Sequence, residues 1–171
     1  MLRWLIRKRL AAVERDLGVP VDYVRHILDV SLGAFLRCGM VMPLEKYRRS
    51  LPAGPYHVAR LVAVRHEDCG PCVQIVVNLA KKDGVAPQVL QAALASGPDA
   101  LPEDLADAYR FAEAVVTRSG DEDRLRERVR QRYGEAGLVE MALAIAVCRI
   151  FPTVKRGLGY ATSCSKVTVH V

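Results

Sequence analysis

"HEDCGPCVQIVVNLAKK", residues 66–82, holds two of the five cysteines of this 171-residue chain, Cys69 and Cys72. An apolar run follows them, and closing lysines with Gly84 just beyond are typical of the C-terminal end of a helix. Asp68 is a residue type that caps helix N-termini. The stretch therefore predicts a helix that begins near residue 68, with Cys69 in its first turn and Cys72 one turn further on.

Helical periodicity continues outward on both sides of this stretch. The proline-rich segment 42–55 predicts a connection, and the alternating tail "KVTVHV" (166–171) fits a short strand or an irregular end. The sequence thus predicts an all-α single domain of about seven or eight helices. Apolar residues recur at helical spacing over residues 2–17, 22–37, 56–64, 87–94, 102–116 and 138–151. A further helix is expected in the segment 119–134, which begins with acids, continues with arginines and stops at Gly134.

The overall composition suits a single globular domain, with 51% hydrophobic residues and a net charge of +6. The arginines are spread along the chain, and those in 124–132 flank Glu127 and follow the acidic residues 121–123, so we expect solvated helix faces and no nucleic-acid partner. We expect no membrane span, although the basic, Trp-containing first helix could rest on a membrane surface. Residues 1–18 do not resemble a secretory signal, so we expect a cytoplasmic location.

In a reducing compartment, a C-x-x-C pair indicates catalysis or metal binding more often than a structural disulfide. A helix N-terminus favours thiolates and can lower a cysteine pKa from about 8.5 to roughly 3.5–7.5. Arg65 and His66 add to this effect, whereas Glu67 and Asp68 oppose it. The pair would therefore be reactive if its sulfurs can be reached from solvent.

Two other interpretations of the pair remain open, a metal site and two idle cysteines. The chain has no second C-x-x-C and no H-x-x-x-H, so we expect no metal. Further ligands could come only from His26, His57, His66, His170, Cys38, Cys148 and Cys164. Of the other cysteines, we expect Cys148 to be inert in the core and Cys38 to be structural, and Cys164 could be an exposed resolving thiol.

The tetrapeptide "CGPC" is also the active-site motif of thioredoxins, and the preceding "ARLVAV" (59–64) could be a strand. A thioredoxin fold, however, needs strands and helices that alternate around the motif. Downstream of residue 85 the pattern is helical, which excludes that fold.

A helix that leads into C-x-x-C at the head of the next helix resembles the alkylhydroperoxidase D-like branch of the carboxymuconolactone decarboxylase family. The order of the later segments, "LADAYRFAEAVVTRSG" (105–120) and "LVEMALAIAVCRIFPTVKRGLGY" (138–160), adds to the likeness. It covers residues 51–160, preceded by an N-terminal helical extension over 1–50. The resemblance implies a homo-oligomeric helical scaffold with a thiol-dependent peroxidase or disulfide reductase activity.

In active members of that family, a glutamate twelve residues before the first cysteine and a histidine four after the second relay protons to the thiols. Here Cys69 and Cys72 match the pair, but the glutamate position falls on His57 and the histidine position on Val76. The slot before Cys72, often another histidine, is Pro71. His57, His66 and Glu67 remain as alternative relays, although each could equally be a solvated surface residue.

We therefore expect one thiolate to attack a peroxide oxygen or a disulfide sulfur, and the other to resolve the intermediate. The family likeness favours Cys72 as the attacker, and the helix terminus favours Cys69. No flavin or metal cofactor is needed, since electrons would come from a partner dithiol protein. The alternative is a catalytically degenerate scaffold or binding protein, and lactone decarboxylation, which uses no such pair, ranks last.

Overall fold

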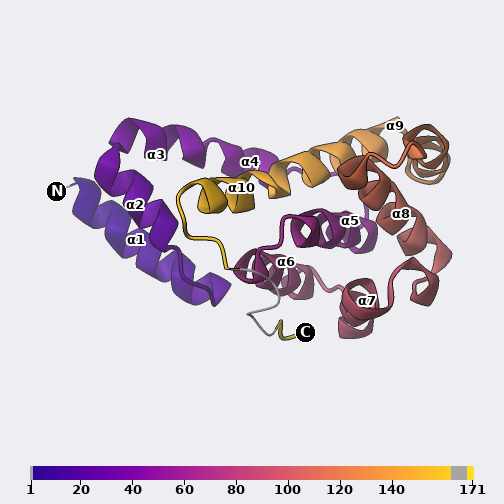
Figure 1. Cartoon of the computed structure of the whole chain (residues 1–171), viewed down its shortest axis with the longest axis horizontal. Helices are drawn as coiled ribbons and strands as arrows, with labels where there is room; N and C mark the ends of the chain where they lie inside the picture. The colour runs from indigo at the N-terminus through magenta and orange to yellow at the C-terminus, as the bar shows by residue number, and fades with distance from the viewer. Residues whose placement is uncertain (1, 163–168) are drawn as a thin grey trace.

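The computed structural model describes residues 2–162 and 169–171, and in these residues it is all-helical with no strand. Eight of its α-helices have eight or more residues, which confirms the predicted number (Figure 1). Two short helical turns, η1 (Ala92–Ser96) and η2 (Pro98–Ala100), follow α7. The α-helices are α1 (Leu2–Leu17), α2 (Asp22–Val30), α3 (Leu32–Gly39), α4 (Val41–Glu45), α5 (Ala53–His66), α6 (Gly70–Lys82), α7 (Pro87–Gln91), α8 (Glu103–Thr117), α9 (Glu122–Cys148) and α10 (Ile150–Gly157).

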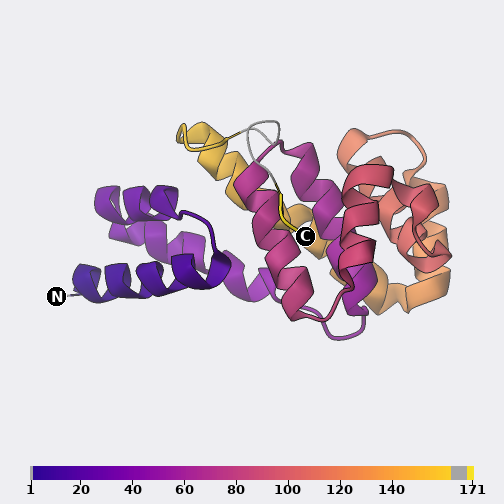
Figure 2. The ribbon, with the colours of Figure 1, turned by 90° about the horizontal axis from the view of Figure 1, so that it is seen from below.

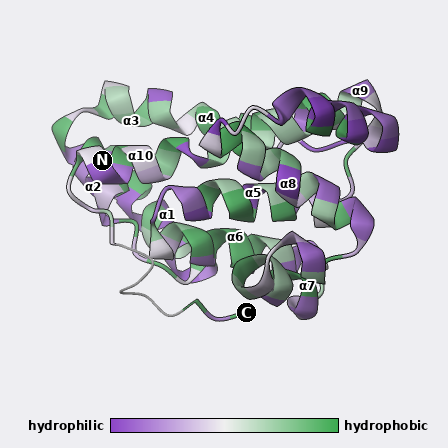
Figure 3. Cartoon of the chain, turned by 45° about the vertical axis from the view of Figure 1, so that its right-hand side comes forward, coloured by the Kyte–Doolittle hydropathy of each residue, from purple (hydrophilic) through white to green (hydrophobic). Residues whose placement is uncertain are grey.

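Helix α5 is the centre of the core. Every residue from Pro55 to Val64 is buried, because α6, α8 and α9 pack around this helix (Figure 1). Figure 3 shows α5 and α6 as mostly hydrophobic, whereas the first part of α9 is hydrophilic. A polar side chain on α5 therefore has no solvent to face and needs a partner inside the protein.

Helices α1 to α3 project from one end of the molecule (Figure 2). No residue of α1 is buried, and the continuous apolar core of the described residues begins at Leu51. Two contacts tie α1 to α6: Asn78 Nδ2 donates to the carbonyl of Leu17 at 2.8 Å, and Lys82 pairs with Asp16 at 2.6 Å. The boundary between an extension over 1–50 and a core over 51–160 stays a prediction.

Two details of the N-terminal part differ from the sequence prediction. The single helix expected over 22–37 is broken at Ser31, whose backbone is extended and whose hydroxyl accepts a hydrogen bond from the N–H of Ala34. Serine prefers this capping position, so it starts the new helix α3. The expected connection over 42–55 also contains most of a short helix, α4.

The arginine-rich segment of α9 ends at Gly134, as the sequence predicts. Gly134 has φ 72° and ψ 176°, a conformation outside the helical region, so the long helix is divided there. The arginines before it are paired with acids. Arg124, Arg126 and Arg130 pair with Asp121, Asp123 and Glu127, and Arg128 and Arg132 both pair with the buried carboxylate of Asp107.

The segment Glu122–Gly157 is long and apolar enough to cross a membrane by length and composition alone, contrary to the expectation that no such run exists. Half of its most apolar window is buried inside the protein, and the core helix of a soluble protein passes the same test. The described residues thus contain one weak candidate span and do not indicate a multi-span membrane protein.

Two predictions concern the C-terminal residues, a short strand or irregular end over 166–171 and an exposed thiol at Cys164. Cys164 and residues 166–168 lie outside the described residues, and Val169–Val171 form neither helix nor strand.

Candidate active site around Cys69 and Cys72

The turn between α5 and α6 places both cysteines at the head of α6. Asp68 has φ 48°, in the left-handed region, and it is not the helix cap that we predicted. Cys69 has extended backbone angles and is the N-cap, so α6 begins at Gly70. The carbonyl of Cys69 accepts from the N–H groups of Cys72 and Val73 at 2.9 and 3.0 Å. Cys72 is therefore the third residue of the helix, one turn from the cap.

The two sulfurs are joined in a disulfide, with the Cα atoms 5.3 Å apart. Both cysteines are buried, Cys69 completely and Cys72 with 5% of its surface exposed. This contradicts the expectation of sulfurs that solvent can reach. An exchange reaction at this pair thus requires the residues that cover it to move.

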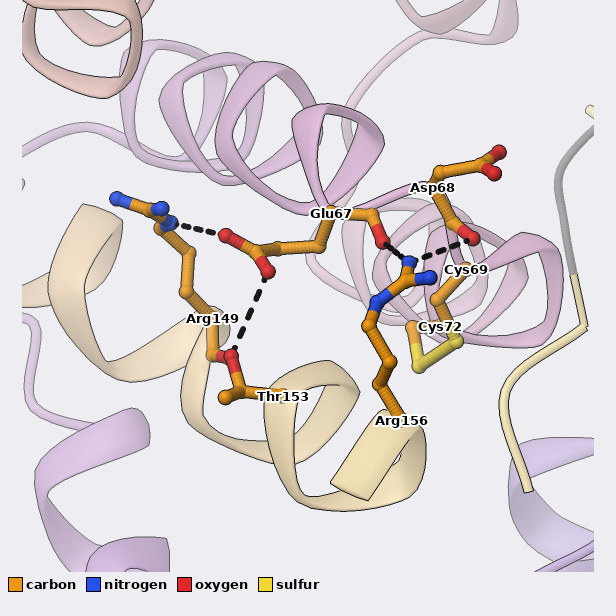
Figure 4. The surroundings of a disulfide bond; sticks show 7 residues. All are labelled: Glu67, Asp68, Cys69, Cys72, Arg149, Thr153 and Arg156. Carbon is orange, nitrogen blue, oxygen red and sulfur yellow. Dashed lines mark hydrogen bonds and ion pairs between the residues drawn. A yellow bond between two sulfur atoms is a disulfide. The ribbon is translucent and has the colours of Figure 1, made fainter. Parts of the chain in front are cut away.

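Side chains in α10 and directly before it bind the turn that precedes the disulfide (Figure 4). The guanidinium of Arg156 donates to the backbone carbonyls of Glu67 and Asp68. Arg149 Nε lies 2.5 Å from Oε1 of Glu67, and the Thr153 hydroxyl donates to Oε2 of the same carboxylate at 3.4 Å. The Glu67 carboxylate is therefore held by Arg149, which precedes α10, and by Thr153 of α10, and it is not aimed at the sulfurs.

The electrostatic consequence concerns the reduced pair. The negative charge of Glu67, which we expected to oppose a thiolate, is neutralised by Arg149. Arg156 brings a further positive charge to the carbonyl of the residue before Cys69. A cation close to a thiol favours its ionised form. The local balance of charge is thus more favourable to a thiolate than the sequence indicates.

The backbone N–H groups at the head of α6 contribute less than expected. Gly70 donates its N–H to the carbonyl of Thr162 at 3.0 Å, and Pro71 has no N–H. The next two N–H groups are taken by the Cys69 carbonyl. In the disulfide form, all first-turn donors are therefore engaged by backbone oxygens.

His57, at the position of the family's glutamate, is buried, with 1% of its surface exposed. Its Nε2 lies 2.9 Å from Oδ2 of Asp83, and its Nδ1 lies 3.4 Å from Nη1 of Arg60. Since a guanidinium can only donate, Nδ1 accepts and Nε2–H donates to Asp83, which describes a neutral ring. Burial, which outweighs the attraction of Asp83, lowers the pKa of His57 to about 4.

This arrangement separates His57 from the disulfide. Asp83 follows the last turn of α6, at the end opposite to the cysteines. Cys72 and Asp83 are eleven residues apart, which is about 16 Å of helix. Both ring nitrogens of His57 are engaged at that end of α6, so His57 is not within hydrogen-bonding reach of a thiol and does not act as the proton relay.

The remaining relay positions are also unfavourable. Val76 is buried and apolar, and Pro71 carries no titratable group. His66 is exposed as the last residue of α5, so it is the nearer of the two predicted histidine relays to the turn. Cys148 is the inert core thiol that we predicted, since burial raises its pKa to about 12.

Three arginines with defined partners were not found from the sequence. Arg60 of α5 forms a buried ion pair with Glu45 of α4. Arg149, between α9 and α10, and Arg156 of α10 both reach the turn before the disulfide. The signal for Arg60 was its position inside an apolar run. Nothing in the sequence indicates that Arg149 and Arg156, more than 80 residues away, contact this turn.

In the described part of the chain, no three His, Cys, Asp or Glu side chains come together as a metal site. Comparison with protein-family models, with curated proteins and with solved structures finds no match for this chain. The likeness to the alkylhydroperoxidase D-like branch therefore stays a prediction from sequence motifs, alongside an all-α fold that the structure does show.

Proposed function

We propose that this protein is a thiol–disulfide oxidoreductase that works through Cys69 and Cys72. The observation that carries the proposal is a pair of cysteines bridged at the head of a helix, with the Arg156 guanidinium bound to the adjoining turn. This combination supports both thiolate formation and reversible closure of the pair. The pair is proposed to act in a cytoplasmic homo-oligomer that exchanges electrons with a partner dithiol protein.

The reaction starts from the reduced pair. One thiolate attacks a sulfur of the substrate disulfide, forms a mixed disulfide and releases the first substrate thiolate. The second cysteine, as its thiolate, attacks the enzyme sulfur of that mixed disulfide and releases the second substrate thiolate, and the Cys69–Cys72 disulfide closes. Two electrons pass to the substrate, and the partner dithiol returns them by the same exchange in reverse.

Disulfide substrates suit the site better than peroxides. Reduction of a peroxide expels an alkoxide or hydroxide, a poor leaving group that needs a proton donor, whereas disulfide exchange expels a thiolate with a pKa near 8.5. The family's proton-relay positions are here occupied by Val76, Pro71 and a His57 that is bound to Asp83. We therefore propose disulfide reduction as the main activity and peroxide reduction as a slow one.

The decisive experiment measures exchange by the reduced protein with a chromogenic aromatic disulfide and with hydrogen peroxide, with dithiothreitol as electron donor. We expect Cys69→Ser and Cys72→Ser each to lower turnover at least 100-fold, and Cys38→Ser, a cysteine away from the site, to leave it unchanged. Wild-type turnover equal to that of the two serine variants would overturn the proposal.

The alternative function is an oligomeric scaffold or binding protein with a structural disulfide. One observation favours it, the burial of both cysteines. The reduction potential separates the two functions: structural disulfides have potentials below about −300 mV, and exchange-active ones lie higher. Equilibration of the pair with glutathione buffers gives this potential directly, and a value below that limit supports the scaffold.

A further inference from the structure

A groove lies between α6, the end of α5, the end of α7 and the turn η1. Its volume is about 530 Å³. Val73, the residue directly after Cys72, lines it together with Leu94 and Ala95. Residues Val169–Val171 form the remaining side, and Figure 1 shows this segment next to α6.

Gln74 holds the segment 169–171 by its backbone. The Gln74 side-chain amide accepts from the N–H of His170 at 2.7 Å and donates to the carbonyl of the same residue at 2.9 Å. A neighbouring β-strand binds a residue with the same pair of hydrogen bonds. This contact therefore recognises an extended chain through its main chain and not through a particular side chain.

The orientation of the Gln74 amide is fixed by a chain of hydrogen bonds. The carbonyl of Leu17 can only accept, so Asn78 Nδ2 donates to it at 2.8 Å. Asn78 Oδ1 must then accept, and Gln74 Nε2 donates to it at 2.8 Å. Gln74 Oε1 is left to accept from His170. The amide is thus preorganised for an extended segment, since it cannot flip without loss of its bond to Asn78.

The side chains of the bound segment complete the recognition. Val169 packs against the apolar core, and His170 and Val171, which are both exposed, line the groove with it. The segment thus carries apolar side chains at alternate positions, of which Val169 is packed on the core. Alternation of apolar side chains around a residue held by its main chain is the pattern by which extended peptides bind to proteins.

We propose that the surface which residues 169–171 cover in cis, made of Gln74 and the α6 and η1 side of the groove, binds an extended polypeptide segment with apolar side chains at alternate positions in their place. We further infer, on the basis of the proposed function, that the segment bound in trans belongs to the partner that exchanges electrons with Cys69 and Cys72. Val73 connects the two sites, because it lines the groove and directly follows Cys72.

Binding is tested with an acetylated, fluorescein-labelled peptide VTVHV, the sequence of residues 167–171, by fluorescence anisotropy. A cis segment competes at an effective concentration near millimolar. We therefore expect the peptide to bind a variant without residues 169–171 at least tenfold more tightly than the full chain. Val169→Asp, which keeps the chain length, should have the same effect as the deletion.

Matched controls distinguish peptide binding in the groove from nonspecific binding elsewhere on the protein. Gln74→Ala, introduced into the shortened chain, should weaken peptide binding at least tenfold, whereas Gln131→Ala on α9 should not change it. The peptide VTDHD, with aspartates in place of Val169 and Val171, should not bind. Equal affinity of VTVHV for the shortened chain and its Gln74→Ala variant would overturn the groove proposal.

The same measurement in a Cys69→Ser, Cys72→Ser double variant distinguishes failure of the groove from failure of the proposed function. Peptide binding to this variant supports the groove whether or not the protein carries out exchange. Exchange activity in the wild type without peptide binding to the shortened chain refutes the groove and leaves the oxidoreductase intact.

Discussion

The imidazole of His57 is hydrogen-bonded to the carboxylate of Asp83, with Nε2 and Oδ2 2.9 Å apart. Asp83 lies at the end of α6 opposite to Cys69 and Cys72. The residue at the position of the family's catalytic glutamate is therefore a buried structural group that connects α5 to the end of α6. Its neutral ring accepts from Arg60, which is itself paired with Glu45. His57 and Arg60 thus pair with each other and with carboxylates of neighbouring segments, and not with the thiols.

This buried ring predicts a pH dependence of stability. The unfolded chain protonates His57 near pH 6.5, but the folded chain does so only near pH 4, the lowered pKa. Between these values the unfolded state binds more protons, so the free energy of unfolding falls as the pH falls, by about 3 kcal/mol from this group. We expect the free energy of unfolding, measured by urea titration, to fall between pH 7 and pH 4 by about 3 kcal/mol less in His57→Gln than in the wild type. Parallel curves for the two proteins would contradict the assignment.

Arg156 predicts the reactivity of the reduced pair. Arg156→Met removes the cation from the turn before Cys69, so the thiol pKa should rise. A higher pKa lowers the thiolate fraction but raises its nucleophilicity, so each unit slows alkylation at pH 7 only about three- to fourfold. The rate of alkylation by iodoacetamide, measured from pH 5 to 9, gives both the thiol pKa and the reactivity of the thiolate. Arg156→Lys should preserve most of the effect, and Arg126→Met, on the surface of α9, should have none.

The sequence predicted the features that depend on local pattern. Apolar spacing identified the main helices, Gly134 marked the division of α9, and C-x-x-C was correctly placed at the head of a helix. Ser31 was missed because apolar periodicity continues across it, although it is a favoured capping residue.

The surroundings of the site could not be predicted, because they come from distant parts of the chain. Arg156 is 88 residues from Asp68, and His170 is 96 residues from Gln74. The burial of His57 had a detectable signal, since the sequence around it is apolar on both sides. A helix surrounded by others buries its polar residues too, and the nearby prolines and glycine led us to consider a solvated end instead.

Glu140 predicts how strongly the connection before α5 is anchored. This buried carboxylate on α9 accepts from the backbone N–H groups of Arg49, Ser50 and Leu51 at 2.8–3.0 Å. Burial alone raises its pKa, but the three donors outweigh burial, and the pKa of Glu140 is lowered. Glu140→Gln should reduce the free energy of unfolding by about 2–4 kcal/mol, because charge-assisted bonds are lost and an amide N–H₂ meets backbone donors.

The matched control for Glu140 lies on the same helix. Glu135 is exposed and paired with Arg130, so Glu135→Gln should cost less than about 1 kcal/mol in the same urea titration. Equal losses for the two variants would mean that the buried hydrogen bonds do not hold the connection.

Gly134 allows the cost of one backbone conformation to be measured alone. Its φ of 72° with ψ of 176° is a region that only glycine adopts without strain. A Cβ at this position would meet no atom within 4 Å, so Gly134→Ala introduces no clash. We expect the variant to lose about 1–3 kcal/mol of unfolding free energy from backbone strain alone.

The matched control is Gly157→Ala in α10. A Cβ at Gly157 also meets no atom within 4 Å, and this glycine has no positive φ. The control variant should therefore be neutral or gain up to about 1 kcal/mol of unfolding free energy, because alanine restricts the unfolded chain. Thermal or urea unfolding of both variants tests this difference in sign, and a stabilised Gly134→Ala would show that α9 passes through this point as a continuous helix.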